Sequence, residues 1–151
     1  ELYVAWAFQA SGDDGRARDA YTNVRTAANA ALALTPDAAE LHLALAFADA
    51  GLGNKDEALR AGHRASELLP VSRDVLSGSS ILIWLAQVEV RVGDNDAAFD
   101  PISKALAAPS GGSISSALLK LDPVWDPLRK DPRFARLLAE GEAPVSTAPK
   151  P

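Results

Sequence analysis

The stretch AELHLALAFADAGLGNKDEALRAGHRASELLP, residues 39–70, contains the signals that decide the expected fold. Two apolar helical segments are separated by Gly53-Asn54, and Pro70 closes the second segment. Glycine favours the left-handed conformation that ends many helices because it has no Cβ, and asparagine can cap the helix that follows. Ala58 is small enough to let two paired helices approach closely. The stretch therefore predicts a helix, a glycine turn and a second helix that proline stops.

A second copy of this pattern follows in the sequence. Residues 79–109 repeat it around Gly93-Asp94, and we expect Asp94 to cap the following helix. Gly53 and Gly93 are 40 residues apart, whereas helix-pair repeats of this size commonly recur at about 34 residues. We assign the excess to a longer connection around Ser72–Ser80.

These paired helices resemble the tetratricopeptide repeat. The start of the chain fits the same pattern, with matching positions at Val4-Ala5, Phe8, Gly12-Asp13 and Ala17. The resemblance implies an all-α fold, a short right-handed superhelix of about three helix pairs that ends in a helical cap. Its units are one helical domain over residues 1–141, with repeats at approximately 1–36, 37–70 and 79–109 and a cap at 114–141.

The first repeat departs from the family pattern. Counting back from Pro36 gives its second helix a surplus of about seven residues, or two helical turns. The surplus keeps the apolar residues on one face, so we predict an extended helix over roughly 16–34. The apolar stripe consists of Ala17, Ala20, Tyr21, Val24, Ala27, Ala28, Ala31 and Leu34.

The C-terminal part has a different composition. Asp-Pro occurs at 122, 126 and 131, and each copy can start a short helix because Asp accepts bonds from free amides and Pro tolerates the first helical position. The expected apolar anchors of this cap are Trp125, Leu128, Phe134, Leu137 and Leu138. The segment DPVWDPL, residues 122–128, resembles the Asp-Pro-Trp-Asp-Pro-Leu endings that close repeat domains in bacterial signalling proteins. Residues 110–113 have the composition of a linker, and 142–151 that of a disordered tail.

Composition agrees with helix and excludes several functions. Of the 151 residues, 48% are hydrophobic and only 6% aromatic, with the helix formers Ala and Leu dominant. A net charge of −5 argues against broad nucleic-acid binding, which needs clustered Lys and Arg. The absence of cysteine removes disulfides, thiol catalysis and thiolate metal sites. No apolar run approaches the roughly 20 residues that span a bilayer, so we expect no membrane insertion.

The sequence gives little support for a metal, cofactor or catalytic site. His42 and His63 fall on different predicted helices without a paired ligand at helical spacing, so we expect neither a metal nor a cofactor. No nucleophile-elbow or phosphate-loop motif is present, and the chain is not expected to be an enzyme. A basic cluster could contact an acidic partner, although a solvated helix face explains it better: Arg129, Lys130, Arg133 and Arg136.

The resemblance instead places a site on the concave surface that the first helix of each repeat lines. Aromatic and arginine side chains are common interface anchors. The positions carried over are Leu2, Trp6, Gln9, Leu43, Phe47, Ala50, Ile83, Gln87, Val90 and Arg91. The chaperone-binding relatives' clamp for a C-terminal carboxylate is missing at these positions.

Three expectations about partners follow. The chain would be an interaction or sensory module of a larger bacterial signalling protein, binding a protein or peptide segment along Trp6, Phe47 and Ile83. Alternatively, the long second helix or the cap fills the groove, and the chain serves as a scaffold. The apolar edge at residues 2–8 could then pair with a second copy in a homodimer. The sequence leaves the compartment open.

Overall fold

The computed structural model describes residues 1–108 and 115–142, which form helices joined by turns. The all-α prediction is confirmed for these residues. The predicted linker at 110–113 and residues 143–151 of the predicted tail lie outside them, whereas residue 142, which we assigned to the tail, belongs to the last helix. The helices are α1 (Leu2–Ala10), α2 (Asp14–Leu32), α3 (Ala39–Leu52), α4 (Lys55–Leu68), α5 (Val75–Arg91), α6 (Phe99–Ala107), α7 (Ser116–Leu121), the 3₁₀ helix η1 (Pro123–Leu128) and α8 (Pro132–Glu142).

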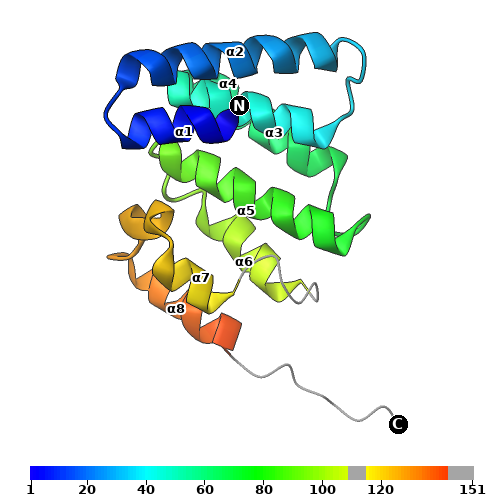
Figure 1. Cartoon of the computed structure of the whole chain (residues 1–151). Helices are drawn as coiled ribbons and strands as arrows, with labels where there is room; N and C mark the ends of the chain where they lie inside the picture. Colours follow the sequence, from blue (N-terminus) through cyan, green and yellow to red (C-terminus); the bar gives the residue numbers. More distant parts are fainter. Residues whose placement is uncertain (109–114, 143–151) are drawn as a thin grey trace.

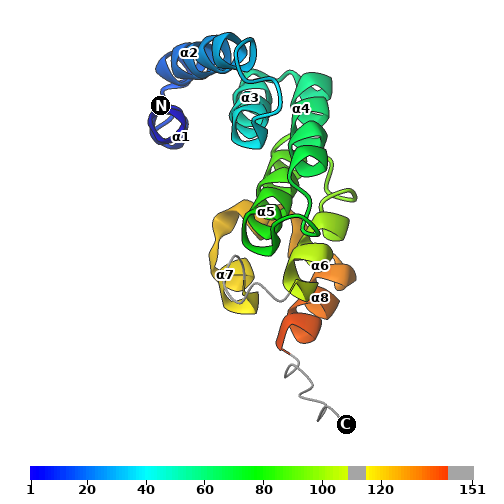
Figure 2. The same ribbon diagram turned by 90° about the vertical axis from the view of Figure 1, so that its right-hand side faces the viewer.

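Helices that follow one another in the chain pack against one another from α1 to α6. The odd-numbered helices also contact each other, α1 with α3 and α3 with α5, so they form a continuous row (Figure 1). Figure 2 shows α4 and α6 along the opposite side of this row. One face of the row is thus available to carry a site.

The three predicted turn glycines end their helices as expected. Gly12, Gly53 and Gly93 have φ values of 76°, 83° and 77°, which lie in the left-handed region. Because this region is strained for a residue with a Cβ, the glycines fix where α1, α3 and α5 turn back.

The extended second helix is also confirmed, with shifted ends. It begins at Asp14 because the Asp13 carboxylate accepts a hydrogen bond from the amide of Arg16. It ends at Leu32, so Leu34, which we placed on the apolar stripe, is 85% exposed. The buried face keeps the predicted helical spacing and consists of Ala17, Tyr21, Val24 and Ala28.

Two predicted caps are wrong. The side-chain amide of Asn54 donates to the carboxylate of Asp49 at 2.8 Å and makes no capping bond to α4. Asp94 does not start a helix, because α6 begins only at Phe99 after a series of turns. In both places a tertiary or turn interaction replaced the local capping bond.

The connection predicted around Ser72–Ser80 is shorter than expected. Asp74 caps α5 by accepting a hydrogen bond from the amide of Ser77 at 2.8 Å, so residues 75–80 are helical. Gly78 lets this first part of α5 approach the preceding chain, since a Cβ there would lie 2.6 Å from the backbone nitrogen of Val71. The extra residues of this repeat therefore lengthen a helix.

The C-terminal segment covers the end of the helical row. Its predicted anchors Trp125, Leu128, Phe134 and Leu137 are buried in one cluster with residues of α5 and α6, and Leu138 packs against that cluster. Asp122 and Asp131 start η1 and α8 by accepting backbone hydrogen bonds. Asp126 lies within η1 and pairs with Arg129, so its predicted role as a helix start is wrong.

Candidate functional site

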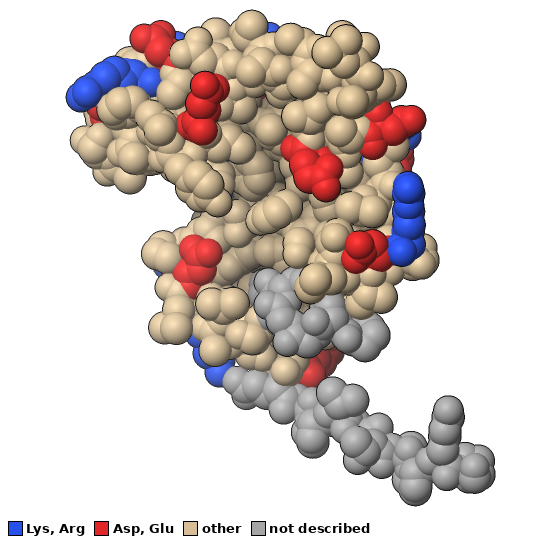
Figure 3. Space-filling model, turned by 45° about the vertical axis from the view of Figure 1, so that its right-hand side comes forward, with Lys and Arg blue, Asp and Glu red and all other residues tan. Residues whose placement is uncertain are grey.

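The candidate site is an apolar groove on the odd-numbered row. Side chains of α1, α3 and α5 enclose a cavity of about 240 Å³. In Figure 3 the face of the molecule is hollowed between its upper and lower parts, and charged side chains are sparse around the hollow. The residues that line the cavity are Leu2, Tyr3, Trp6, Glu40, Leu43, Ala44, Phe47 and Trp84.

Aromatic rings form the floor and the rim of the groove. The Trp6 ring contacts Phe47 edge-to-face at a centroid distance of 5.4 Å, and Tyr3 contacts Trp6 in the same way at 5.3 Å. Phe47 is only 5% exposed and forms part of the floor. Tyr3 and Trp84 are 80% and 42% exposed, so they present large apolar surface to solvent. Such exposed aromatics beside a cavity are typical of interaction sites.

Arg91 adds a cation to this aromatic group. Its guanidinium carbon lies 5.0 Å from the centre of the Trp6 ring and 5.7 Å from that of Phe47, within range for cation–π attraction. Burial lowers the pKa of Arg91, but an arginine remains charged in proteins. Within residues 1–108 and 115–142, Arg91 forms neither an ion pair nor a side-chain hydrogen bond. Arg91 is an exposed residue and does not line the cavity itself, so its positive charge lies at the edge of the aromatic groove.

The structure brings together four of the seven predicted site residues. Leu43 and the two rings of Trp6 and Phe47 line the groove, and Arg91 stacks beside those rings. Gln9 does not line it, because its amide oxygen accepts a hydrogen bond from the Tyr21 hydroxyl at 2.7 Å.

The other two residues lie away from the groove aromatics. Ile83 is 7% exposed and belongs to the cluster that holds the cap, together with Val90 and Trp125. Gln87 is half-buried on α5 and is not among the residues that line the cavity. The predicted strip is thus divided: the cap covers its α5 end, and the part near α1 and α3 stays open.

Sequence reasoning missed Tyr3, Glu40, Ala44 and Trp84. Helical spacing could have found the last three. Glu40 and Ala44 share one helix face with Leu43 and Phe47, since these positions follow the i, i+3, i+4, i+7 pattern. Trp84 lies seven residues before Arg91, or about two turns, so it shares the face of that arginine better than Ile83 does.

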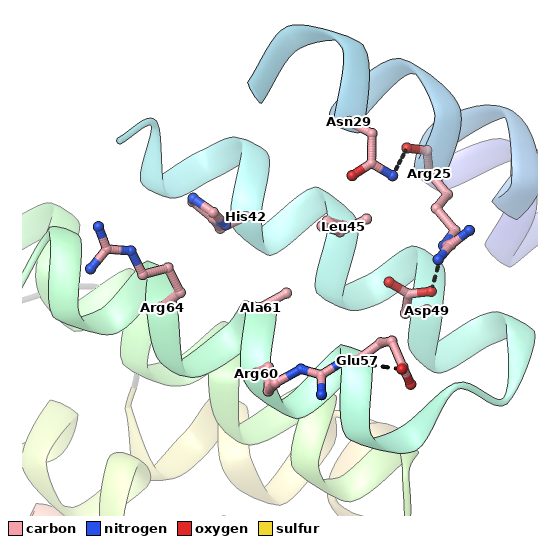
Figure 4. Close-up of a pocket in the computed structure, with 9 residues that line it drawn as sticks. All are labelled: Arg25, Asn29, His42, Leu45, Asp49, Glu57, Arg60, Ala61 and Arg64. Atoms are coloured by element: carbon pink, nitrogen blue, oxygen red, sulfur yellow. Dashed lines mark hydrogen bonds and ion pairs between the residues drawn. The ribbon is translucent and has the colours of Figure 1, made fainter. Parts of the chain in front are cut away.

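A second, polar pocket of about 290 Å³ lies between α2, α3 and α4 (Figure 4). Its three arginines are already paired: Arg25 with Asp49 at 2.8 Å, Arg60 with Glu57 at 3.1 Å and Arg64 with Asp37 at 3.1 Å. The Asp49 carboxylate is buried and also accepts a hydrogen bond from Asn54. The pair of Arg25 and Asp49 joins α2 to α3, and the bond from Asn54 ties the following turn to α3, so the pocket is explained by helix packing.

The two histidines lie apart, as expected from their helices. The ring nitrogen Nε2 of His42 is 2.8 Å from the carbonyl oxygen of Pro36, and that of His63 is 3.9 Å from a carboxylate oxygen of Glu89. Among the described residues, no group of three or more His, Cys, Asp or Glu side chains could hold a metal ion. We therefore assign no metal ligands.

The basic cluster near the C-terminus is largely engaged within the chain. Arg133 pairs with Asp131 and Asp96 and stacks over the Phe99 ring at 4.2 Å. Arg129 pairs with Asp126 and donates to the backbone carbonyls of Lys120 and Asp122. These two arginines thus hold the cap in place.

Glu89 is the most unusual titratable group. It is buried at the contact of α5 with α4, and within the described residues its Oε2 atom has no hydrogen-bond partner. Burial, with repulsion from Asp94 and Asp100, raises its pKa from 4.5 to about 7.

The sequence matches no protein-family model, and the searches of curated proteins and of solved structures also return no match. In the part of the chain that the structure covers, no helix combines the length and apolar character needed to cross a bilayer.

Proposed function

We propose that the chain is a protein-interaction module of the tetratricopeptide type, in which paired helices wind into a short superhelix and one face binds a peptide segment. The observation that carries this proposal is the aromatic groove, because exposed Tyr3 and Trp84 flank a cavity built from three helices. Interfaces depend on a few aromatic and arginine anchors in such positions.

The wider setting is a larger bacterial signalling protein, in which the module would act in interaction or sensing. The support is the resemblance of the segment DPVWDPL, residues 122–128, to endings in such proteins. In this chain the segment packs onto α5 and α6, as a terminal cap of stacked repeats would.

A random peptide library displayed on phage tests the interaction. We expect selected peptides to lose at least tenfold in affinity for Trp84→Ala or Tyr3→Ala, since truncating a central aromatic anchor commonly costs about 2 kcal/mol or more. Fluorescence polarisation with labelled peptide measures the affinity. Phe47 is a poor probe because it is buried, and its replacement would disturb folding and binding together.

Leu34→Ala is the matched control, because Leu34 is an exposed residue just after the end of α2 and does not line the groove. The Leu34→Ala variant should bind the selected peptides with the same affinity as the unchanged chain. Peptides that bind Trp84→Ala and Tyr3→Ala as well as the unchanged chain would contradict the groove assignment.

A homodimerisation scaffold is the second candidate. The exposed residues Tyr3 and Val4 on α1 favour it, because they leave apolar surface at the end of the helical row. Light scattering over a concentration series would then show the mass rising toward that of a dimer, and Val4→Lys would prevent the rise. A mass that stays monomeric at high concentration counts against this candidate.

A further inference from the structure

We propose that Arg91 makes the groove selective for acidic peptides. The bound segment places an aliphatic or aromatic side chain in the cavity. An Asp or Glu a few residues away in the same segment binds the Arg91 guanidinium through its carboxylate. This inference rests on the proposed function and specifies its ligand. Its basis is the Arg91 guanidinium, which lies beside the aromatic rings of the groove and has no carboxylate within ion-pair distance in the described parts of the chain. The Asp122 carboxylate attracts it only from farther away.

The position of Arg91 suits this role. The guanidinium carbon lies 5.0 Å from the centre of the Trp6 ring and 5.7 Å from that of Phe47. No side-chain hydrogen bond among the described residues uses its N–H groups, so they are available to bind a ligand. A carboxylate accepts two parallel hydrogen bonds from such a group. The two rings beside the guanidinium attract its positive charge and help to hold it at the edge of the groove.

The opposite charge within the groove gives the peptide a direction. Glu40 lines the cavity near the start of α3, seven residues before Phe47, which corresponds to about 10 Å along the helix. Arg91 lies beside Phe47, so the negative and positive groups are separated along the groove. A peptide carboxylate is attracted at the Arg91 end and repelled at the Glu40 end.

The test begins with the peptides selected from the random library. We expect Asp or Glu to be enriched at one position relative to the apolar anchor. Changing that residue to Asn or Gln should weaken binding to the unchanged chain about tenfold, the usual scale for a hydrogen-bonded charge. The same change should have little effect on binding to Arg91→Gln, because the two charges act as a pair.

Two further variants make the result specific. Arg18→Gln removes an arginine of α2 that forms no ion pair among the described residues, so it is a control for net charge and should leave affinity unchanged. Arg91→Lys keeps the charge but loses planar stacking, and should recover only part of the affinity. Circular dichroism confirms that each variant is folded.

The outcomes separate the two proposals. The role of Arg91 is overturned if the selected peptides need Trp84 but show no preference for acidic residues and bind Arg91→Gln as tightly as the unchanged chain. The assignment of the groove as the binding site would then still stand. Failure to select any peptide that depends on Trp84 overturns the proposed function, and the role of Arg91 with it.

Discussion

Trp125→Ala should destabilise the C-terminal cap, lowering the free energy of unfolding by about 3–5 kcal/mol, the range for removing a buried large aromatic side chain. Trp125 is 1% exposed and packs in one cluster with residues of α5, α6 and α8. Its loss would leave a cavity where η1 contacts α5. Urea denaturation followed by circular dichroism measures the change.

The matched control is Leu118→Ala in the same cap. Leu118 is more than half exposed, so its truncation should lower the free energy of unfolding far less than that of Trp125. Amide hydrogen exchange adds spatial detail. In Trp125→Ala, protection should fall first in α7, η1 and α8, while α2 and α3 stay protected. Equal destabilisation by both variants would show that the cap is not anchored through Trp125.

The helix ends and buried helix faces that were predicted correctly depend on residues close together in the sequence. Gly53 ends α3 because its own φ demands a residue without Cβ, and the spacing within α2 alone places Tyr21 and Val24 on the buried face. Asn54 was mispredicted as a cap because its amide instead binds Asp49, which also receives a bond from Arg25. That arginine lies on another helix, so no local pattern could reveal the competition.

Part of the groove could also be predicted from the sequence, because some of its residues follow from spacing within a single helix. The sequence resemblance predicted that Trp6, Leu43 and Phe47 share one surface, and all three line the groove. Ile83 and Trp84 are neighbours in sequence but point about 100° apart around α5. The choice between them depends on which face the cap covers, and that is decided by the packing of Trp125, far along the chain.

Comparison of the two turns shows why Glu89 is exceptional. Asp49 and Glu89 each lie four residues before a turn glycine, Gly53 or Gly93, and both are buried. Asp49 is neutralised by Arg25 and also bonded by the amide of Asn54. Glu89 has only His63 at 3.9 Å, and Asp94 takes the place of the amide. The second copy of the arrangement therefore buries a carboxylate without a permanent positive partner.

The unchanged chain should lose about 2–3 kcal/mol of stability between pH 5 and pH 8 because of Glu89, and Glu89→Gln should abolish most of this loss. In the unfolded chain the group has its ordinary pKa of 4.5, and folding raises it to about 7. The folded state therefore binds the proton more tightly. The stabilisation is complete below the unfolded value and disappears as the pH rises through the folded one.

Urea denaturation at several pH values measures this dependence, and His63→Gln shows what the neighbouring imidazole adds. The carboxylates with lowered pKa, Asp13, Asp74 and Asp131, do not interfere, because they titrate below pH 4 in both folded and unfolded states. Glu57→Gln, at an exposed position on α4, controls for the loss of one carboxyl group. A pH dependence that Glu89→Gln leaves unchanged would show that Glu89 is already ionised in the folded protein at pH 5.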